Sequence, residues 1–210
     1  MNEELIFGPR ILPDDPLVDT YRVQGGDSLD RIARNEGLAV DWRFLQRING
    51  LANPNMIRRD QTLKIVRGPF HAVVYKDQYR MDVFAGPPDD PSNWMFIRSF
   101  NVGLGSDDST PVGEFVVRSD SKLVNPTWTN PRTGEVYAAD NPENPIGERW
   151  LGLQGVGQYA ALAGYGIHGT IEPDSIGTQA SMGCVRLKPA DIEIVYEMLA
   201  EAVSVVVIEE

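Results

Sequence analysis

The chain is poor in residues that form cross-links or bind metals. Its 210 residues include one cysteine and two histidines. A single cysteine cannot form an internal disulfide, so a disulfide framework is excluded. One thiol and two histidines far apart in sequence are too few for a zinc site, and we expect no metal and no cofactor. No apolar run approaches the length of a membrane-spanning helix.

Basic residues are scarce relative to acidic ones. The sequence has 19 Lys and Arg against 30 Asp and Glu, a formal net charge of −11. Because phosphate backbones bind to basic faces, nucleic acid is not an expected partner. The acidic N-terminus, Met1-Asn-Glu-Glu, lacks the basic and apolar regions of a signal peptide, so no export signal is visible. No feature of the sequence predicts an oligomeric state.

Apolar residues are frequent enough for a packed core. They make up 42% of the chain, whose length allows one large domain or two small ones. Residues 1–19, rich in Pro and Asp, predict an N-terminal arm with no packed face of its own. Residues 20–67 predict a compact strand–helix–helix–strand unit. Its two helices are indicated by possible caps at Asp27 or Ser28 and near Asp41, by apolar residues at helical spacing (Leu29, Ile32 and Ala33; Phe44, Leu45 and Ile48), and by a stop at Asn49-Gly50.

The first unit resembles a LysM domain. The similarity rests on "YRVQGGDSLDRIA" and "LQRINGLANPNMIRRDQTLKIV", with Asp60 where the family usually has Gly. It implies binding to glycan that contains N-acetylglucosamine, such as the peptidoglycan backbone or chitin. The open alternative is a small packing module without a ligand. The resemblance puts the glycan groove along Gly26, Asp27, Ser28 and Leu29 and along Asn53, Pro54, Asn55, Met56 and Ile57.

The residue pattern changes from helical to β-prone after a short hinge at residues 67–70. Residues 70–210 contain short β-prone runs separated by Gly, Pro, Asp and Asn. One good helix, "KPADIEIVYEMLAEA", comes late and is followed by a last strand, "VSVVVIE". This pattern predicts a mainly β sandwich or barrel with a late helix. The whole chain is therefore expected to be an α+β protein of two domains.

The lone cysteine lies in "GIHGTIEPDSIGTQASMGCVRL", sixteen positions after one of the two histidines. The Cys184 thiol is a nucleophile as thiolate, and the His168 imidazole can take its proton. Gly183 lets main-chain N–H groups approach an oxyanion, Ser181 offers a hydroxyl, and Arg186 could favour the thiolate or bind a carboxylate. Spacing alone leaves another interpretation open, in which the thiol is a small buried hydrophobe, the histidine only a hydrogen-bonding residue and the arginine a surface charge.

The second unit resembles the catalytic domain of L,D-transpeptidases of the YkuD type. The similarity rests on "HGT" followed by "SMGCVRL", supported by "STPVGEFVV" and "NPIGERWLGL". It implies that Cys184 is the nucleophile and that His168 is the base, oriented by the main-chain carbonyl of Gly169. It also implies an oxyanion hole from the Gly183 and Cys184 N–H groups, in a site shaped by Ser181 and Arg186. Relatives often carry His or a basic residue where this chain has Met182, and His71 is interpreted as structural.

The resemblance implies cysteine acyl transfer in peptidoglycan. A stem tetrapeptide would acylate the thiol and release D-alanine, and a diamino-acid side-chain amine on a second stem would accept the acyl group. Carbapenem acylation is expected from the same resemblance. Two alternatives remain: an L,D-carboxypeptidase that uses water as acceptor, and a wall-binding protein with an inert second domain. The partners would be glycan strands and stem peptides, and the location an extracytoplasmic wall or periplasm. Since no export signal is visible, either a signal has been trimmed from this sequence or the protein is exported by another route.

Overall fold

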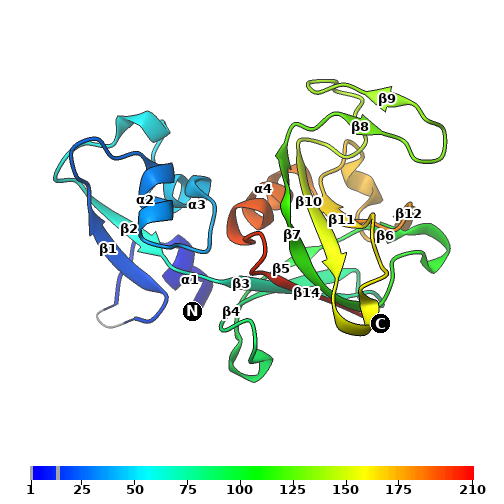
Figure 1. Cartoon of the computed structure of the whole chain (residues 1–210), viewed down its shortest axis with the longest axis horizontal. Coiled ribbons are helices and arrows are strands. Elements are labelled where there is room, and N and C mark those ends of the chain that lie inside the picture. The colour runs from blue at the N-terminus through cyan, green and yellow to red at the C-terminus, as the bar shows by residue number, and fades with distance from the viewer. Residues whose placement is uncertain (1, 13–14) are drawn as a thin grey trace.

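The computed structural model describes residues 2–12 and 15–210. A small N-terminal unit of two strands and two helices lies beside a larger unit built on one β-sheet (Figure 1). The predicted α+β class is confirmed, with a βααβ module followed by a mainly β unit with a late helix. The helices in the described ranges are all too short or too polar to cross a lipid bilayer.

The N-terminal unit follows the predicted order. It consists of β1 (Val18–Arg22), α2 (Leu29–Asn35), α3 (Trp42–Ile48), the 3-10 helix η1 (Pro54–Met56) and β2 (Thr62–Val66), and β1 pairs antiparallel with β2. The Ser28 hydroxyl caps α2 by accepting the Arg31 N–H at 3.2 Å. Asp41 caps α3 by accepting the Arg43 N–H at 2.9 Å. The chain leaves α3 through Gly50, whose φ of +59° favours glycine.

The prediction that residues 1–19 have no packed face is wrong. They contain the helix α1 (Asn2–Phe7), in which Ile6 is fully buried. Phe7 meets Phe44 of α3 edge-on at 5.5 Å between ring centroids. The Lys64 ammonium donates to the carbonyls of Leu5 at 2.5 Å and Gly8 at 2.6 Å, near the end of the helix. Three apolar residues, Leu5 to Phe7, supply a packing face that the Pro- and Asp-rich composition of the segment concealed.

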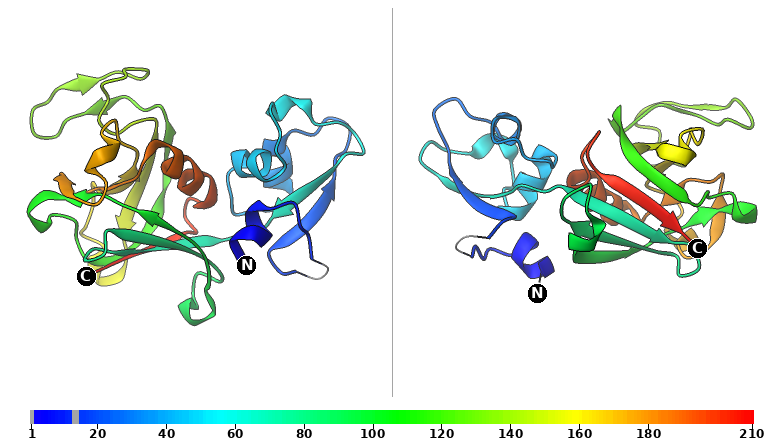
Figure 2. Two further views of the ribbon diagram at one scale, coloured as in Figure 1. Left: turned by 180° about the vertical axis from the view of Figure 1, so that it is seen from behind. Right: turned by 60° about the horizontal axis from the view of Figure 1, so that its bottom comes forward.

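The larger unit is organised by an eight-stranded sheet that curls into a half-barrel (Figures 1 and 2). Its strand order is β13-β11-β10-β7-β14-β3-β4-β5, and only the β11–β13 and β14–β3 pairs are parallel. The strands are β3 (Phe70–Tyr75), β4 (Arg80–Ala85), β5 (Met95–Asn101), β7 (Gly113–Val124), β10 (Arg149–Gly155), β11 (Gly166–His168), β13 (Val185–Arg186) and β14 (Val205–Glu209).

Smaller elements connect the strands of the sheet, and most of them lie toward the edge that carries β11 and β13, whereas η2 lies between β4 and β5 at the other edge. They are β6 (Leu104–Gly105) paired with β12 (Gln179–Ser181), the antiparallel pair β8 (Trp128–Thr129) and β9 (Val136–Tyr137), the helix α4 (Pro189–Met198), and the 3-10 helices η2 (Pro91–Asn93), η3 (Ser106–Asp108), η4 (Gly157–Tyr159) and η5 (Pro173–Ser175). The β8–β9 pair stands away from the sheet in Figure 1. The predicted late helix is α4, with Ile192, Val195 and Met198 buried.

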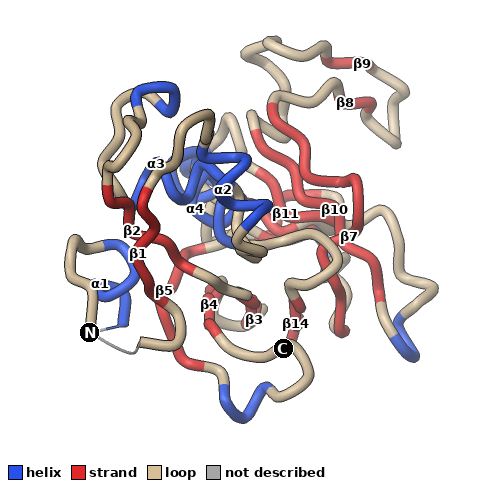
Figure 3. Tube along the Cα trace, turned by 60° about the vertical axis from the view of Figure 1, so that its left-hand side comes forward, coloured by secondary structure: helices blue, strands red, loops and turns tan. Residues whose placement is uncertain are grey.

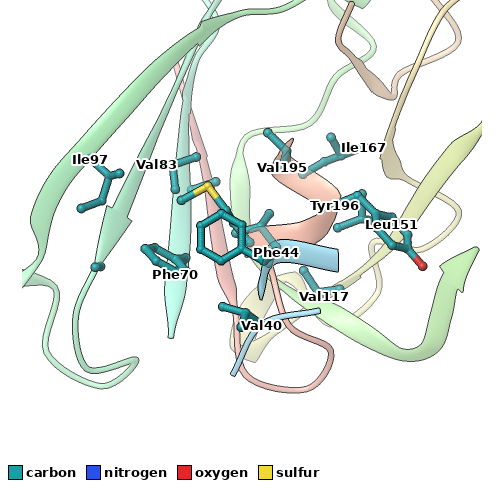
Figure 4. Packing of buried hydrophobic residues seen from close by; sticks show 14 of the residues in the cluster. Val40, Phe44, Phe70, Val83, Ile97, Val117, Leu151, Ile167, Val195 and Tyr196 are labelled. Atoms are coloured by element: carbon teal, nitrogen blue, oxygen red, sulfur yellow. The ribbon is translucent and has the colours of Figure 1, made fainter. Parts of the chain in front are cut away.

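The two units share one hydrophobic core, so the segment at residues 67–70 is not a free hinge. Phe44 of α3 is fully buried and meets Phe70 of β3 edge-on at 5.9 Å. Figure 4 shows both rings in the same packing as Val195 and Tyr196 of α4. The α3 and α4 helices contact each other across the junction (Figure 1), and Figure 3 views this junction with the N-terminal unit in front. A polar link supports this contact, because the Asp41 N–H donates to the Glu197 carbonyl at 2.9 Å.

Candidate active site

Sheet pairing places the lone thiol and an imidazole at one cavity. In the parallel β11–β13 pair, His168 lies opposite Arg186, and Cys184 comes two residues before Arg186 on the same side of the extended segment. Cys184 and His168 both line a cavity of about 390 Å³, together with Trp128, Tyr137 and Trp150. Two residues sixteen positions apart in sequence therefore open onto one space, at the end of the sheet beneath β8 and β9.

Hydrogen bonding defines the state of His168. Its Nδ1 lies 2.6 Å from the Gly169 carbonyl, which can only accept, so Nδ1 carries the proton. Nε2 is then left with a lone pair. The side chain is 5% exposed, and this burial is the main reason why its pKa falls to about 4. The hydrogen bond to Gly169 opposes this shift and the Arg186 charge adds to it. The ring is a neutral base at neutral pH.

Cys184 is a neutral thiol in the resting structure. Burial raises the pKa of this thiol to about 11, although the main chain of Gly166 lowers it in part. The structure does not show the role in favouring the thiolate that was one of the two predicted for Arg186, because its charge does not act on the half-buried sulfur. A neutral thiol that lines the same cavity as a neutral imidazole suits general-base chemistry, in which the proton leaves the sulfur as the sulfur attacks.

The turn before Cys184 is held by one hydroxyl. Ser181 Oγ donates to the Cys184 carbonyl at 2.7 Å and accepts the Gly183 N–H at 3.2 Å. Gly183 has a φ of +122°, and a Cβ there would lie 2.9 Å from the Tyr165 ring. The position therefore requires glycine, but its N–H is already used. Of the two N–H groups expected to stabilise an oxyanion, the one on Cys184 is the donor not committed to Ser181.

Arg186 is not a surface charge. It is 6% exposed, and its Nη1 donates to Ser175 Oγ at 2.8 Å. Gly103 lies against the guanidinium, since a Cβ there would be 2.8 Å from Nη2. Within residues 2–12 and 15–210, the buried Arg186 Nε has no hydrogen-bond partner. Arg186 thus ties β13 to η5, which directly follows Glu172 in the wall of the cavity.

Sequence reasoning assigned no role to Trp150, although it quoted the segment that contains it. Trp150 of β10 pairs in register with His168, and the two rings stack at 5.7 Å with 19° between their planes. A Cβ on Gly166 would lie 2.6 Å from the indole, so the ring fits only over glycine. The period-2 pattern of β10 places Trp150 on a strand face, but only the pairing register places it on the imidazole.

The other histidine belongs to the sheet. His71 Nδ1 accepts the Val205 N–H at 3.0 Å, so its Nε2 carries the proton donated to the Gly86 carbonyl at 2.9 Å. The ring stacks on Trp94 at 4.4 Å. Both nitrogens are satisfied inside the fold.

Part of the first predicted glycan segment is occupied by internal contacts. Leu29 is 2% exposed and packs in the core, so its side chain cannot line a groove, contrary to what the resemblance implied. Ser28 caps α2, and Asp27 Oδ2 accepts from the Tyr21 hydroxyl at 2.9 Å. Gly26, with a φ of +87°, is exposed.

The second predicted glycan segment is more open. Met56 is 62% exposed and lines a shallow cavity of about 430 Å³ with Arg58, Arg59, Asp60 and Gln61. Asn53 and Asn55 are exposed and joined by a hydrogen bond of 2.9 Å, whereas Pro54 and Ile57 are half-buried.

Comparison with known proteins gives matches to two families. Residues 70–208 match the family described as the L,D-transpeptidase catalytic domain, YkuD, and residues 21–66 match the LysM domain. The chain is 31% identical over 183 residues to the "Putative L,D-transpeptidase YkuD" of Bacillus licheniformis, covering 82% of this chain and 88% of that one. It is 30% identical over 112 residues to the "Putative L,D-transpeptidase YqjB" of Bacillus subtilis, covering 53% of this chain and 59% of that one. Among solved structures, an L,D-transpeptidase from Mycobacterium tuberculosis H37Rv aligns with 92% of this chain and 90% of its own at 14% identity and a TM-score of 0.49.

Proposed function

Because this chain belongs to the L,D-transpeptidase family, with a YkuD catalytic domain behind a LysM domain, we propose that it cross-links peptidoglycan stems by cysteine acyl transfer. Its parts would be an arm at residues 1–19, a glycan-binding domain at 20–67 and a catalytic domain at 70–210. One observation carries the proposal: the only thiol and a neutral imidazole, fixed through Nδ1, line the same cavity.

The first half-reaction forms a thioester. His168 Nε2 takes the proton of the Cys184 thiol while the sulfur attacks the carbonyl of the diamino acid in a stem tetrapeptide. The Cys184 N–H donates to the oxyanion that develops. The imidazolium then gives the proton to the amine of D-alanine as the peptide bond breaks. The acyl-enzyme is left with a neutral imidazole, ready for a second proton transfer.

The second half-reaction consumes the thioester. The neutral side-chain amine of a diamino acid on another stem attacks the acyl carbon, and His168 accepts the proton that the amine loses. The proton returns to the sulfur as the thiolate leaves, which restores the starting enzyme. No cofactor is required, because the broken peptide bond supplies the acyl group for the new one. Ser181 and Gly183 hold the turn that aims the sulfur, and Arg186 supports the cavity wall.

The LysM domain would hold glycan strands close to this cavity. A bound strand raises the effective concentration of its stem peptides near Cys184. The residues predicted for the groove that are exposed enough to contact a sugar are Gly26, Ser28, Asn53, Asn55 and Met56. Both domains would then act on the same polymer, and this supports the proposal that the protein works in an extracytoplasmic wall or periplasm.

The test is incubation with disaccharide-tetrapeptide, followed by mass spectrometry of the products. A cross-linked dimer formed with loss of D-alanine is expected, whereas tripeptide alone would identify a carboxypeptidase. Cys184→Ala should abolish either product but keep retention on insoluble peptidoglycan. A carbapenem should add its mass to the wild-type chain and not to this variant. Unchanged product formation by Cys184→Ala would refute the proposal.

A further inference from the structure

A partly buried ion pair crosses the junction between the LysM domain and the catalytic domain. Arg47 of α3 grips Glu197 of α4 with two hydrogen bonds, from Nε at 2.5 Å and from Nη2 at 2.8 Å. Glu197 is only 6% exposed, and Arg47 opposes the rise in its pKa that burial causes. Arg47 Nη2 also lies 3.8 Å from Glu193, one helical turn earlier. The LysM domain therefore holds one face of α4 at two successive turns.

The α4 helix also contacts the residue that orients the proposed base, His168. Ile192, next to Glu193 in α4, is 2% exposed and packs on Gly169, where a Cβ would lie 3.3 Å from its Cγ2. Gly169 is the residue whose carbonyl accepts the proton of His168 Nδ1. Since a helix moves as a unit, a shift of α4 changes the support of that carbonyl.

A second set of contacts reaches the other side of the imidazole. Glu193 Oε1 lies 3.5 Å from Arg149 Nη2, so Glu193 stands between an arginine of each domain. Arg149 begins β10, and its carbonyl accepts the Gly169 N–H at 3.4 Å. The next residue, Trp150, stacks on His168. The carbonyl that orients the ring and the indole that covers it both rest on contacts that lead to α4.

We infer that the LysM domain is part of the scaffold of the active site, with Arg47 as a positioning residue that acts on His168 through α4. This inference rests on the proposed function and goes beyond it, because a domain that only tethers glycan would not affect chemistry on a soluble peptide. Loss of Arg47 leaves the buried Glu197 carboxylate without its partner. The carboxylate then either takes up a proton or moves toward solvent, and in moving it displaces α4. Small displacements of a catalytic group lower rates steeply, so we expect acylation to slow about tenfold to a hundredfold.

The two histidines make the coupling measurable. His168 and His71 give separate signals in NMR of histidine-labelled protein, and His71 lies in the sheet as an internal control. In wild type, His168 should stay neutral until about pH 4. In Arg47→Leu its midpoint should move up toward the ordinary value for histidine, while the His71 signal keeps its position. An unchanged His168 titration would overturn the inference, whatever the enzyme's substrate proves to be.

Kinetics provide the second readout. Acylation of Cys184 by a free tetrapeptide without sugar should slow in Arg47→Leu, chiefly in kcat, while retention on insoluble peptidoglycan is kept. Arg47→Lys should fall between the two, and the exchange pair Arg47→Glu with Glu197→Arg should recover part of the rate. If Arg47→Leu fails to fold, Arg47→Lys and the exchange pair decide the question by the same two readouts.

The matched control is Arg34→Leu in α2 of the same domain. It removes the ion pair between Arg34 and Asp30, in which the arginine side chain is 72% exposed. It should change neither readout. Equal acylation rates in wild type and Arg47→Leu would contradict the inference and show that the LysM domain acts only as a tether. A wild type that no tetrapeptide acylates would instead refute the proposed function, and the histidine titration would still test the coupling.

Discussion

Acidification should destabilise this protein through His168, by an amount that its surroundings allow us to work out. Burial lowers the pKa of the folded imidazole from 6.5 to about 4. An unfolded chain has no such burial, so its histidine takes up a proton near pH 6.5. Between these two values the unfolded state binds one more proton than the folded state. Stability from this group is therefore complete above pH 6.5 and falls as the pH drops toward 4.

The size of the effect follows from the difference between the two pKa values. Each unit of difference corresponds to about 1.4 kcal/mol, so a gap of about 2.5 units gives roughly 3 kcal/mol. With the side chain 5% exposed, solvent screens little of this. A typical domain is stable by about 5–15 kcal/mol, so the loss is a large share of the total.

The measurement is urea unfolding of wild type and His168→Gln at several values between pH 7.5 and pH 4. All other titrating groups are shared, so the difference between the two curves isolates His168. Wild type should lose about 3 kcal/mol more than the variant across this range. Acylation of Cys184 should persist in wild type down to pH values well below 6.5, because the imidazole stays neutral there. Parallel stability curves, or an acylation rate that halves near pH 6.5, would refute the assignment of His168 as a buried neutral base.

Three other changes test neighbouring parts of the structure. Raising the pH from 9 to 11 should destabilise wild type relative to Cys184→Ala by about 2 kcal/mol, because the folded thiol keeps its proton to about pH 11 while the unfolded thiol loses it near pH 9. Chemical denaturation checks this, and equal losses in the two proteins would contradict it. Trp150→Leu should leave the fold intact in circular dichroism but slow acylation and raise the pKa of His168, since water then reaches one face of the ring; an unchanged pH–rate profile would count against the stacking. Phe44→Ala should cost about 3–5 kcal/mol of unfolding free energy, and a loss below 1 kcal/mol would show that the shared core is not packed as described.

Local signals in the sequence predicted the small domain well. Capping depends on a side chain and a main-chain N–H two or three residues away, so Ser28 and Asp41 could be recognised as helix starts. The apolar faces of α2 and α3 follow from helical spacing in the same way. The packing of α1 was missed because Leu5 to Phe7 is too short for any periodicity, and its partners Phe44 and Lys64 lie far along the chain.

In the candidate site, too, local features could be predicted from the sequence, whereas features that depend on the whole fold could not. Gly183 and Ser181 belong to the turn around Cys184, so their neighbourhood could be predicted from the motif. The stacking of Trp150 on His168 needs the register of two strands, which spacing does not supply. The protonation state of the resting Cys184 depends on its burial, which depends on the whole fold, so the sequence could not predict it.

The shared core around Phe44 and Phe70 bears on how such proteins can be recombined. Two domains joined only by a flexible linker can be exchanged between proteins like independent cassettes. Here a foreign LysM domain with a smaller or larger side chain at the position of Phe44 would leave Phe70 facing either a void or a clash. A working chimera would therefore have to carry matched residues on both sides of the boundary, and chimeras cut at residue 68 should yield insoluble protein more often than those that exchange both rings together.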